Sequence, residues 1–184
     1  MRQRILGMLA AAIMATAGFA ATTTKAPATD AEIGQKIAKE IRMYSRYTIW
    51  DNVNLRVNDG EVELLGEVSQ PWKKKDMERL AMNVPGVTSV TNELKVLPLS
   101  SFDNDLRIRV ARAIYGHPSL SRYAIQAIPP IHIIVDNGRV KLEGVVNSDM
   151  EKTIAGIQAG TAGLSFGAVE NNLRVENPSR KSSG

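Results

Sequence analysis

Few side chains in this sequence are of the types that commonly carry out catalysis. The chain has no cysteine and two histidines, His117 and His132, whose spacing does not match a metal site. No nucleophile can be paired with a base from the sequence. Four aspartates lie at predicted turns or helix caps, where carboxylates bond the backbone: Asp51, Asp59, Asp136 and Asp149. We therefore expect no catalytic residue, no metal and no cofactor.

One cluster of side chains is of a type that binds anions. It consists of a tryptophan, three lysines and an arginine one turn later: Trp72, Lys73, Lys74, Lys75 and Arg79. The lysines lie at a predicted helix start, where the helix dipole disfavours cations, so their placement costs some stability. A tryptophan beside lysines suits an anionic lipid surface, at about 1 kcal/mol per basic contact. The alternative is a solvated helix face, balanced by Asp76 and Glu78, with Trp72 packed inward.

The elements that position these residues occur twice, 78 residues apart. Residues 53–68 and 131–146 share an apolar alternation, an Asp-Gly or Asn-Gly pair and a later glycine. The pattern Asn-x-Leu-x-Val then occurs at residues 92–96 and again at 171–175. Such a repeat indicates one small folded unit that is used twice. Because the copies share turns and apolar positions rather than reactive side chains, the repeat favours binding or assembly.

Each copy begins with a predicted amphipathic helix. Thr29 and Glu32 form a capping box for the first helix, and Ser100 and Asp103 take the same places before the second. The apolar faces are Ile33, Ile37 and Ile41 in the first copy and Leu106, Val110 and Ile114 in the second. Neither helix is long enough to be stable alone, so each stripe must pack on another element.

A β-hairpin follows in each copy. The turn residues are Asp59 and Gly60 in the first copy and Asn137 and Gly138 in the second. Such pairs between alternating runs are the strongest short-range hairpin signal, because both residues accept a positive φ. Gly66 and Gly144 lie six residues past the turn glycine, inside the return strand. A glycine there marks a bulge or the close approach of another backbone.

A second helix and a third strand complete each copy. Pro71 takes the first helical position of one helix, and Ser148 and Glu151 form a capping box for its counterpart. The predicted inward residues are Met77, Leu80, Ala81 and Val84 in the first copy and Ile154 and Ile157 in the second. The sequence therefore predicts an α+β fold of two α-β-β-α-β modules, each a three-stranded mixed sheet with two helices on one face.

The modules are expected at residues 30–98 and 101–177, preceded by a signal peptide and a leader and followed by a tail. Residues 1–20 have the basic start, apolar run and small-residue site of a cleaved signal peptide, the alternative being a retained membrane anchor. Residues 21–29 read as a flexible leader and residues 178–184 as a disordered tail. Without cysteine, neither a disulfide nor a lipidated N-terminal cysteine can form. We expect a soluble periplasmic protein that is not a lipoprotein.

The charge of the chain is unevenly distributed. The formal net charge is +4, but five of the 23 Lys and Arg residues lie in the two ends. All 19 acidic residues lie between Asp30 and Glu176, so this span carries 18 basic and 19 acidic residues, a net charge of −1. A folded region near neutrality lacks the positive field that dominates nucleic-acid binding. We therefore expect no nucleic-acid partner.

The copies differ most between the first helix and the first strand. The segment from Tyr115 to Pro130 is seven residues longer than its counterpart, Tyr44 to Asn52. If one copy is specialised for a ligand, this loop is the expected place. The alternative is that Ile125 and Ile128 cover the edge of the core.

Together these motifs resemble the BON domain. The shared features are the helix, the Asp/Asn-Gly turn, Val-x-Leu-x-Gly-x-Val, the second helix, Pro-Gly-Val and Asn-x-Leu-x-Val. Two copies behind a signal peptide are similar to the osmotically inducible periplasmic proteins of Gram-negative bacteria. The resemblance covers about Asp30 to Glu176 and implies phospholipid binding, membrane association and support of envelope integrity under stress, without enzymatic activity. The second copy departs from it by lacking Pro-Gly-Val, and the chain lacks a lipid-anchor cysteine.

Three functions remain open at this point. The first is a peripheral contact with anionic phospholipid through the Trp72 cluster. The second is a protein-interaction or chaperone-like adaptor for other envelope proteins, because small mixed sheets have an exposed edge strand. The third is an enzyme or transport-accessory module that uses the loop from Tyr115 to Pro130. We expect the first.

Overall fold

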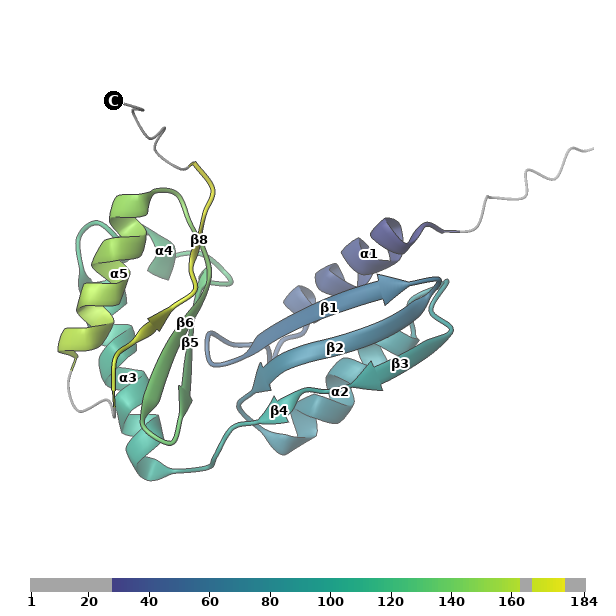
Figure 1. Ribbon diagram of the computed structural model, residues 1–184, viewed down its shortest axis with the longest axis horizontal. Helices are drawn as coiled ribbons and strands as arrows, with labels where there is room; N and C mark the ends of the chain where they lie inside the picture. The colour runs from purple at the N-terminus through teal and green to yellow at the C-terminus, as the bar shows by residue number, and fades with distance from the viewer. Residues whose placement is uncertain (1–27, 163–166, 178–184) are drawn as a thin grey trace, which may run out of the picture.

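The computed structural model describes residues 28–162 and 167–177, which form two modules (Figure 1). The first contains α1 (Asp30–Met43), β1 (Asn52–Asn58), β2 (Glu61–Val68), α2 (Pro71–Met82), β3 (Ser89–Asn92) and β4 (Lys95–Val96). The second contains α3 (Ser101–Gly116), α4 (Ser121–Ala124), β5 (Ile131–Asp136), β6 (Arg139–Val146), α5 (Asp149–Thr161), β7 (Glu170–Asn171) and β8 (Arg174–Val175). The predicted signal peptide, nearly all of the leader and the tail lie outside the described residues.

Both modules have the predicted mixed sheet. Strand β1 pairs antiparallel with β2, and β3 and β4 both pair parallel with β2. The second module repeats this arrangement with β5, β6, β7 and β8. The predicted third strand is thus two short strands. The asparagine of Asn-x-Leu-x-Val lies at the break: the Asn92 amide donates to the Lys74 carbonyl at 2.8 Å and its oxygen accepts from the Leu94 N–H. Asn171 repeats both bonds.

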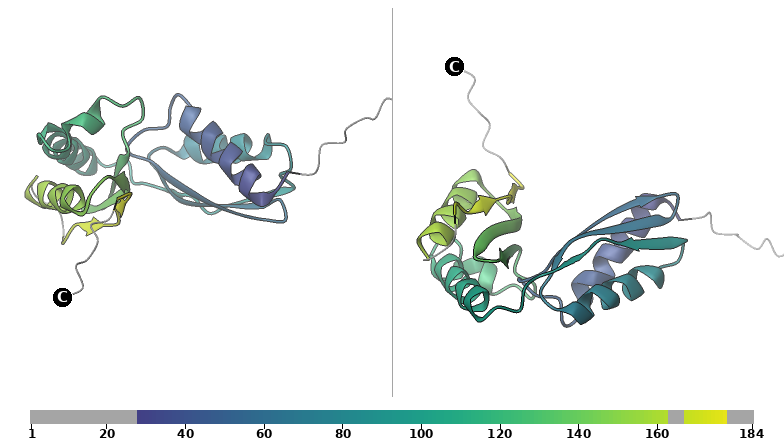
Figure 2. Two further views of the ribbon diagram at one scale, coloured as in Figure 1. Left: turned by 90° about the horizontal axis from the view of Figure 1, so that it is seen from above. Right: turned by 60° about the horizontal axis from the view of Figure 1, so that its bottom comes forward.

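Two helices cover one face of each sheet (Figure 2). The predicted apolar faces of α1 and α3 are buried, as are three of the four predicted inward residues of α2: Met77, Ala81 and Val84. The prediction for α5 is wrong in part, because Ile157 is 55% exposed. The inward face of α5 is instead Glu151, Ala155 and Ala159, four residues apart. Ile157 lies between these positions and therefore faces outward.

The hairpin turns have the predicted geometry and an additional tie. Asp59 and Asn137 have φ of 49° and 51°, and each is followed by a glycine with positive φ. The Asp30 carboxylate at the start of α1 accepts from the N–H groups of residues 59 and 60. Asp103 in α3 does the same for residues 137 and 138. The Ser100 hydroxyl caps α3, but Asp103 does not complete a capping box because its side chain binds this turn.

Gly66 and Gly144 mark the predicted close approach of backbones. Their φ values are 110° and 114°, and a Cβ would overlap the Asn52 and Pro130 carbonyl oxygens respectively. Both positions therefore need glycine on two grounds, conformation and space.

The loop from Tyr115 to Pro130 is largely structural. Helix α3 continues into it, and α4 places Leu120 and Tyr123 in the second core. The prediction that Ile125 covers the core edge is wrong, since its side chain is 88% exposed, whereas Ile128 is half-buried. No helix within the described ranges is long and apolar enough to cross a bilayer.

Candidate functional site at the junction of the two modules

The first module packs with one end against the outer face of the second sheet. Ile134 points away from its own core, yet it is 2% exposed. Its counterpart in the first copy is the exposed Arg56, so the second sheet has an apolar outer position where the first is charged. The Ile133 N–H donates to the Ile49 carbonyl at 2.7 Å, and Ile49 and Trp50 pack against the second core. The segment before β1 therefore belongs to both modules.

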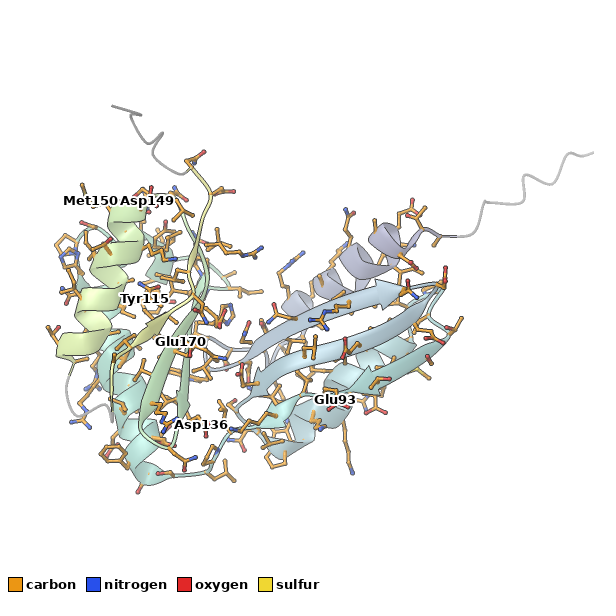
Figure 3. All side chains as sticks on the ribbon, in the orientation of Figure 1. Glu93, Tyr115, Asp136, Asp149, Met150 and Glu170 are labelled. Atoms are coloured by element: carbon orange, nitrogen blue, oxygen red, sulfur yellow. The ribbon has the colours of Figure 1, made fainter. Side chains whose placement is uncertain are left out.

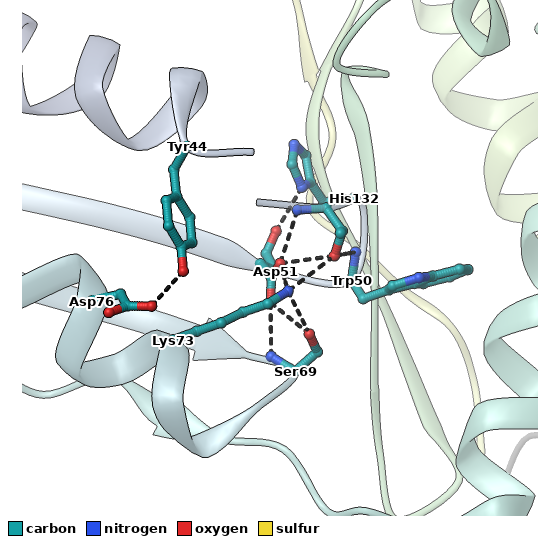
Figure 4. Close-up of polar contacts among 8 residues, drawn as sticks. Tyr44, Trp50, Asp51, Ser69, Lys73, Asp76 and His132 are labelled. Carbon is teal, nitrogen blue, oxygen red and sulfur yellow. Dashed lines mark hydrogen bonds and ion pairs between the residues drawn. The ribbon is translucent and has the colours of Figure 1, made fainter. Parts of the chain in front are cut away.

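Asp51, the last residue of this segment, is fully buried within a polar cluster (Figure 4). Its carboxylate accepts from the N–H and hydroxyl of Thr48 at 2.9 and 2.8 Å. It also accepts from the N–H and hydroxyl of Ser69, at 2.7 and 2.8 Å, and from the Lys73 ammonium at 2.5 Å. One carboxylate thus joins the loop, the end of β2 and the start of α2.

Lys73 is buried in this cluster, with 3% of its surface exposed. Its ammonium donates to Asp51, to the Ser69 hydroxyl at 2.9 Å and to the Thr48 hydroxyl at 3.4 Å, which matches its three N–H donors. The prediction that Lys73 contributes to a lipid-binding surface is therefore wrong. The reason lies in the helical phase, because Lys73 precedes the buried Met77 by four residues and shares its inward face.

The contact between Ser69 and Lys73 has the composition of a nucleophile and a base, but its hydrogen bonds do not fit that chemistry. The lysine directs its N–H bonds to three acceptors and presents no lone pair that could take a proton. Ser69 is buried, and its hydroxyl is directed to the Asp51 carboxylate. The cluster is therefore a structural ion pair with its hydrogen bonds satisfied.

The second module has the same connection with the charges inverted. Glu151 of α5 takes the place of Lys73 and is likewise buried. Its carboxylate accepts from the Arg122 guanidinium, from the Tyr123 hydroxyl at 2.9 Å and from the Asn147 N–H at 3.0 Å. Asn147 takes the place of Ser69. In both copies, a buried charge at the start of the second helix fixes the segment before the first strand.

Further contacts cross the junction. The His132 Nδ1 donates to the Asp51 carbonyl at 2.6 Å, an assignment that follows because a carbonyl can only accept. His132 therefore faces the module interface. Two ion pairs also cross it: Lys95 with Asp136, and Lys141 with Glu67. Burial lowers the pKa of His132, an effect partly opposed by its bond to Asp51.

This pKa shift predicts a weaker junction in mild acid. A histidine with a lowered pKa in the folded state contributes stability that is present above its unfolded pKa of about 6.5 and is lost as the pH falls through the folded pKa. Between the two pKa values the loss is at most about 1.4 kcal/mol per pH unit. We expect thermal unfolding from pH 7 to 5 to show a smaller decrease in Tm for His132→Gln than for wild type. His117→Gln is the control, and identical profiles for wild type and His132→Gln would contradict the prediction.

The remaining residues of the predicted binding cluster lie on or beside the outer face of α2. Trp72 is 40% exposed rather than packed inward, and the Arg46 guanidinium lies 5.1 Å from its ring centroid. Lys75 and Arg79 are exposed, and Arg79 pairs with Asp76. Lys74 is half-buried at the flank.

We call Trp72, Lys75, Arg79 and Met82 the α2 outer face. Met82 is exposed, and the spacing of the four residues places them on one side of the helix. The sequence pattern contains this spacing, so Met82 could have been found from it. Arg46 could not, because it comes from the loop between α1 and β1, which is distant in sequence from α2.

The corresponding face of α5 has no basic residue. Met150, Thr153 and Ile157 take the places of Trp72, Lys75 and Arg79, and all three are exposed. Met150 is labelled on α5 in Figure 3. The two modules therefore present different surfaces at the same structural position. Across residues 28–162 and 167–177, no cluster of three or more His, Asp or Glu residues is suited to a metal ion.

Comparison with known proteins gives a family and several distant likenesses. The family model described as BON domain matches residues 29–98 and 103–177. An uncharacterized protein in the gshII 5′ region of Anaplasma centrale is 27% identical over 144 residues, which cover 73% of this chain and 88% of that protein.

Among solved structures, similarity is found to the C-terminal domain of CdsD, a structural protein of the type III secretion system of Chlamydia trachomatis. The identity is 12% and the TM-score 0.31, with 77% of this chain and 63% of that chain covered. A second CdsD structure has 15% identity and a TM-score of 0.27, with 79% and 92% covered.

Proposed function

This chain belongs to the BON domain family, and from that premise we propose that it is a non-enzymatic periplasmic protein that binds anionic phospholipid at a membrane surface. Its contribution to the cell is the integrity of the envelope under stress. The observation that supports this proposal is the α2 outer face, where an exposed tryptophan lies beside exposed basic side chains. A buried ion pair fixes the start of this helix, so the face is held rigidly.

The chemistry of this face suits a peripheral and reversible contact. Trp72 offers a ring of the kind that settles at the headgroup level of a bilayer. Arg46, Lys75 and Arg79 add about 1 kcal/mol each near an anionic surface. That sum gives weak, salt-sensitive binding rather than permanent anchoring.

Vesicle flotation tests the proposal. Reversing two charges with Lys75→Glu and Arg79→Glu should lower the partition coefficient onto vesicles that contain phosphatidylglycerol at least tenfold, because each reversal replaces an attraction with a repulsion. The matched control is Lys36→Glu with Lys39→Glu, two exposed positions on α1. Lys73 is left unchanged, since its replacement would disturb the core. Equal recovery of the two double variants would contradict the proposal.

A free sheet edge supports a second candidate, an adaptor for envelope proteins. Among the described strands, β1 pairs with β2 alone, so its other edge can accept a strand from a partner. The edge of β5 is already occupied, because its Ile133 N–H donates to the Ile49 carbonyl. A photo-crosslinker at Asn58 in intact cells should capture specific envelope proteins if this candidate is correct, whereas one at Lys39 should not. Capture of lipid alone would count against it.

A further inference from the structure

A cavity of about 300 Å³ lies between the two modules. The first module contributes the end of α1, Tyr47 and the start of β1. The second contributes Ile128, Pro130 and parts of β5, β6 and β8, which lie beside the C-terminal end of α1 (Figure 1). The cavity therefore exists only when the modules are docked as described.

Two arginines, one from each module, line this cavity. They are Arg42, in the last turn of α1, and Arg174, in β8, and both are exposed. Within the described part of the chain, neither forms an ion pair, and the wall of the cavity contains no Asp or Glu. Arg56 and Arg122, by contrast, are paired with Glu63 and Glu151. Two arginines that line one concavity without an acidic residue in its wall form a place where an anion can bind.

The rest of the wall is mainly apolar. Leu55, Ile128 and Val145 supply hydrocarbon surface from both modules, and Asn52 and Asn54 supply amide groups. An apolar concavity with a few polar groups is the usual composition of a site for a small organic ligand. A free inorganic ion would leave this hydrocarbon surface unused.

We propose that the cavity binds one molecule of an anionic amphiphile, with its phosphate or carboxylate head on Arg42 and Arg174 and its apolar chain along Leu55, Ile128 and Val145. Arginine suits this role because its guanidinium can bind an oxyanion through two parallel hydrogen bonds. This site goes beyond the proposed membrane contact and does not depend on it, since none of the four residues of the α2 outer face lines the cavity. A ligand held by both modules also stabilises the docked arrangement.

Calorimetric titration of the intact chain with dodecyl phosphate, below its critical micelle concentration, tests the proposal. We expect saturable binding of one molecule per chain. Inorganic phosphate should bind at least tenfold more weakly, and dodecyl maltoside, which has the tail but no charge, should not compete. Arg42→Gln and Arg174→Gln should each weaken binding at least tenfold, because each removes one of the two cations.

Control variants separate this site from others. Arg112→Gln removes an exposed arginine that does not line the cavity and should leave binding unchanged. The pair Lys75→Glu and Arg79→Glu should also leave it unchanged, although the same pair is expected to reduce vesicle recovery.

Four outcomes would overturn the cavity site. The first three are absence of saturable binding, equal binding by the Arg42 and Arg174 variants and wild type, and inorganic phosphate that binds as tightly as dodecyl phosphate. Binding that is lost only in the α2 variant would move the anion to the α2 outer face, which refutes the cavity site while supporting the membrane contact.

Discussion

Replacing Lys73 with methionine should lower the free energy of unfolding by about 3 kcal/mol or more, the usual cost of removing one partner of a buried ion pair. Methionine has a similar length and fills the space of the lysine stem. It leaves the Asp51 carboxylate, which is fully buried, with four hydrogen bonds from neutral donors and no opposite charge. The segment before β1 depends on this carboxylate, so both the first module and the junction should be weakened.

Urea denaturation of matched variants would measure this effect. Lys75→Met, two residues along the same helix and exposed, should change the free energy of unfolding by no more than about 0.5 kcal/mol. Asp51→Asn combined with Lys73→Met should cost less than the sum of the two single changes, because the second change removes the unpaired charge that the first leaves behind. A Lys73→Met variant within about 0.5 kcal/mol of wild type would refute the role of the pair. Its α2 outer face is intact, so vesicle binding by the folded fraction should persist.

The two buried ion pairs imply that one copy cannot be exchanged for the other one residue at a time. The first copy has Lys73 on α2 and its anion in the short segment before β1. The second has Glu151 on α5 and its cation, Arg122, in the longer loop. Exchanging only the helix residue would bring together two like charges in each module. The loop lengths and the helix charges are therefore coupled features of each copy.

Local patterns predict the elements of this fold because they report local physics. The Asp-Gly and Asn-Gly turns, the capping residues and the four-residue spacing of the isoleucines in α1 each depend on a few neighbouring residues. The prediction that Ile157 faces inward in α5 is wrong because it assigns the large apolar residue to the core. The buried face is instead formed by the smaller Ala155 and Ala159. Glu151 is held inward by its bonds to Arg122, Tyr123 and Asn147, and Ala155 and Ala159 follow it on the same face at a spacing of four residues.

The polar cluster at the junction depends on contacts between residues that are distant in sequence, which a local sequence pattern does not reveal. Lys73 could have been assigned to the inward face from its spacing to Met77, but its partner Asp51 is 22 residues away and has the sequence context of a turn residue. Ile134 breaks the alternation of β5 and could have indicated a covered outer face. Nothing in the sequence says that the first module covers it, because docking depends on the combined shape of two surfaces.

Substituting Gly144 with alanine should be at least as damaging as breaking the ion pair, with an expected loss of about 3 kcal/mol or more. A φ of 114° is a conformation that alanine rarely adopts, which alone costs about 1–3 kcal/mol. The added Cβ would also overlap the Pro130 carbonyl oxygen, which is main-chain and cannot rotate away. Relief would require β6 to separate from the residues before β5, and these same residues line the junction cavity.

Gly160→Ala provides the matched control for this prediction. Gly160 lies in α5, and a Cβ added there would meet no atom within 4 Å beyond its own helix backbone, so alanine should be neutral or stabilising by up to about 1 kcal/mol. Chemical denaturation of the two variants therefore compares the same substitution with opposite expected signs. If Gly144→Ala were as stable as wild type, the backbone contact with Pro130 would not be a constraint on the fold. Gly66→Ala should repeat the loss in the first module, because the repeat places the same contact with Asn52 there.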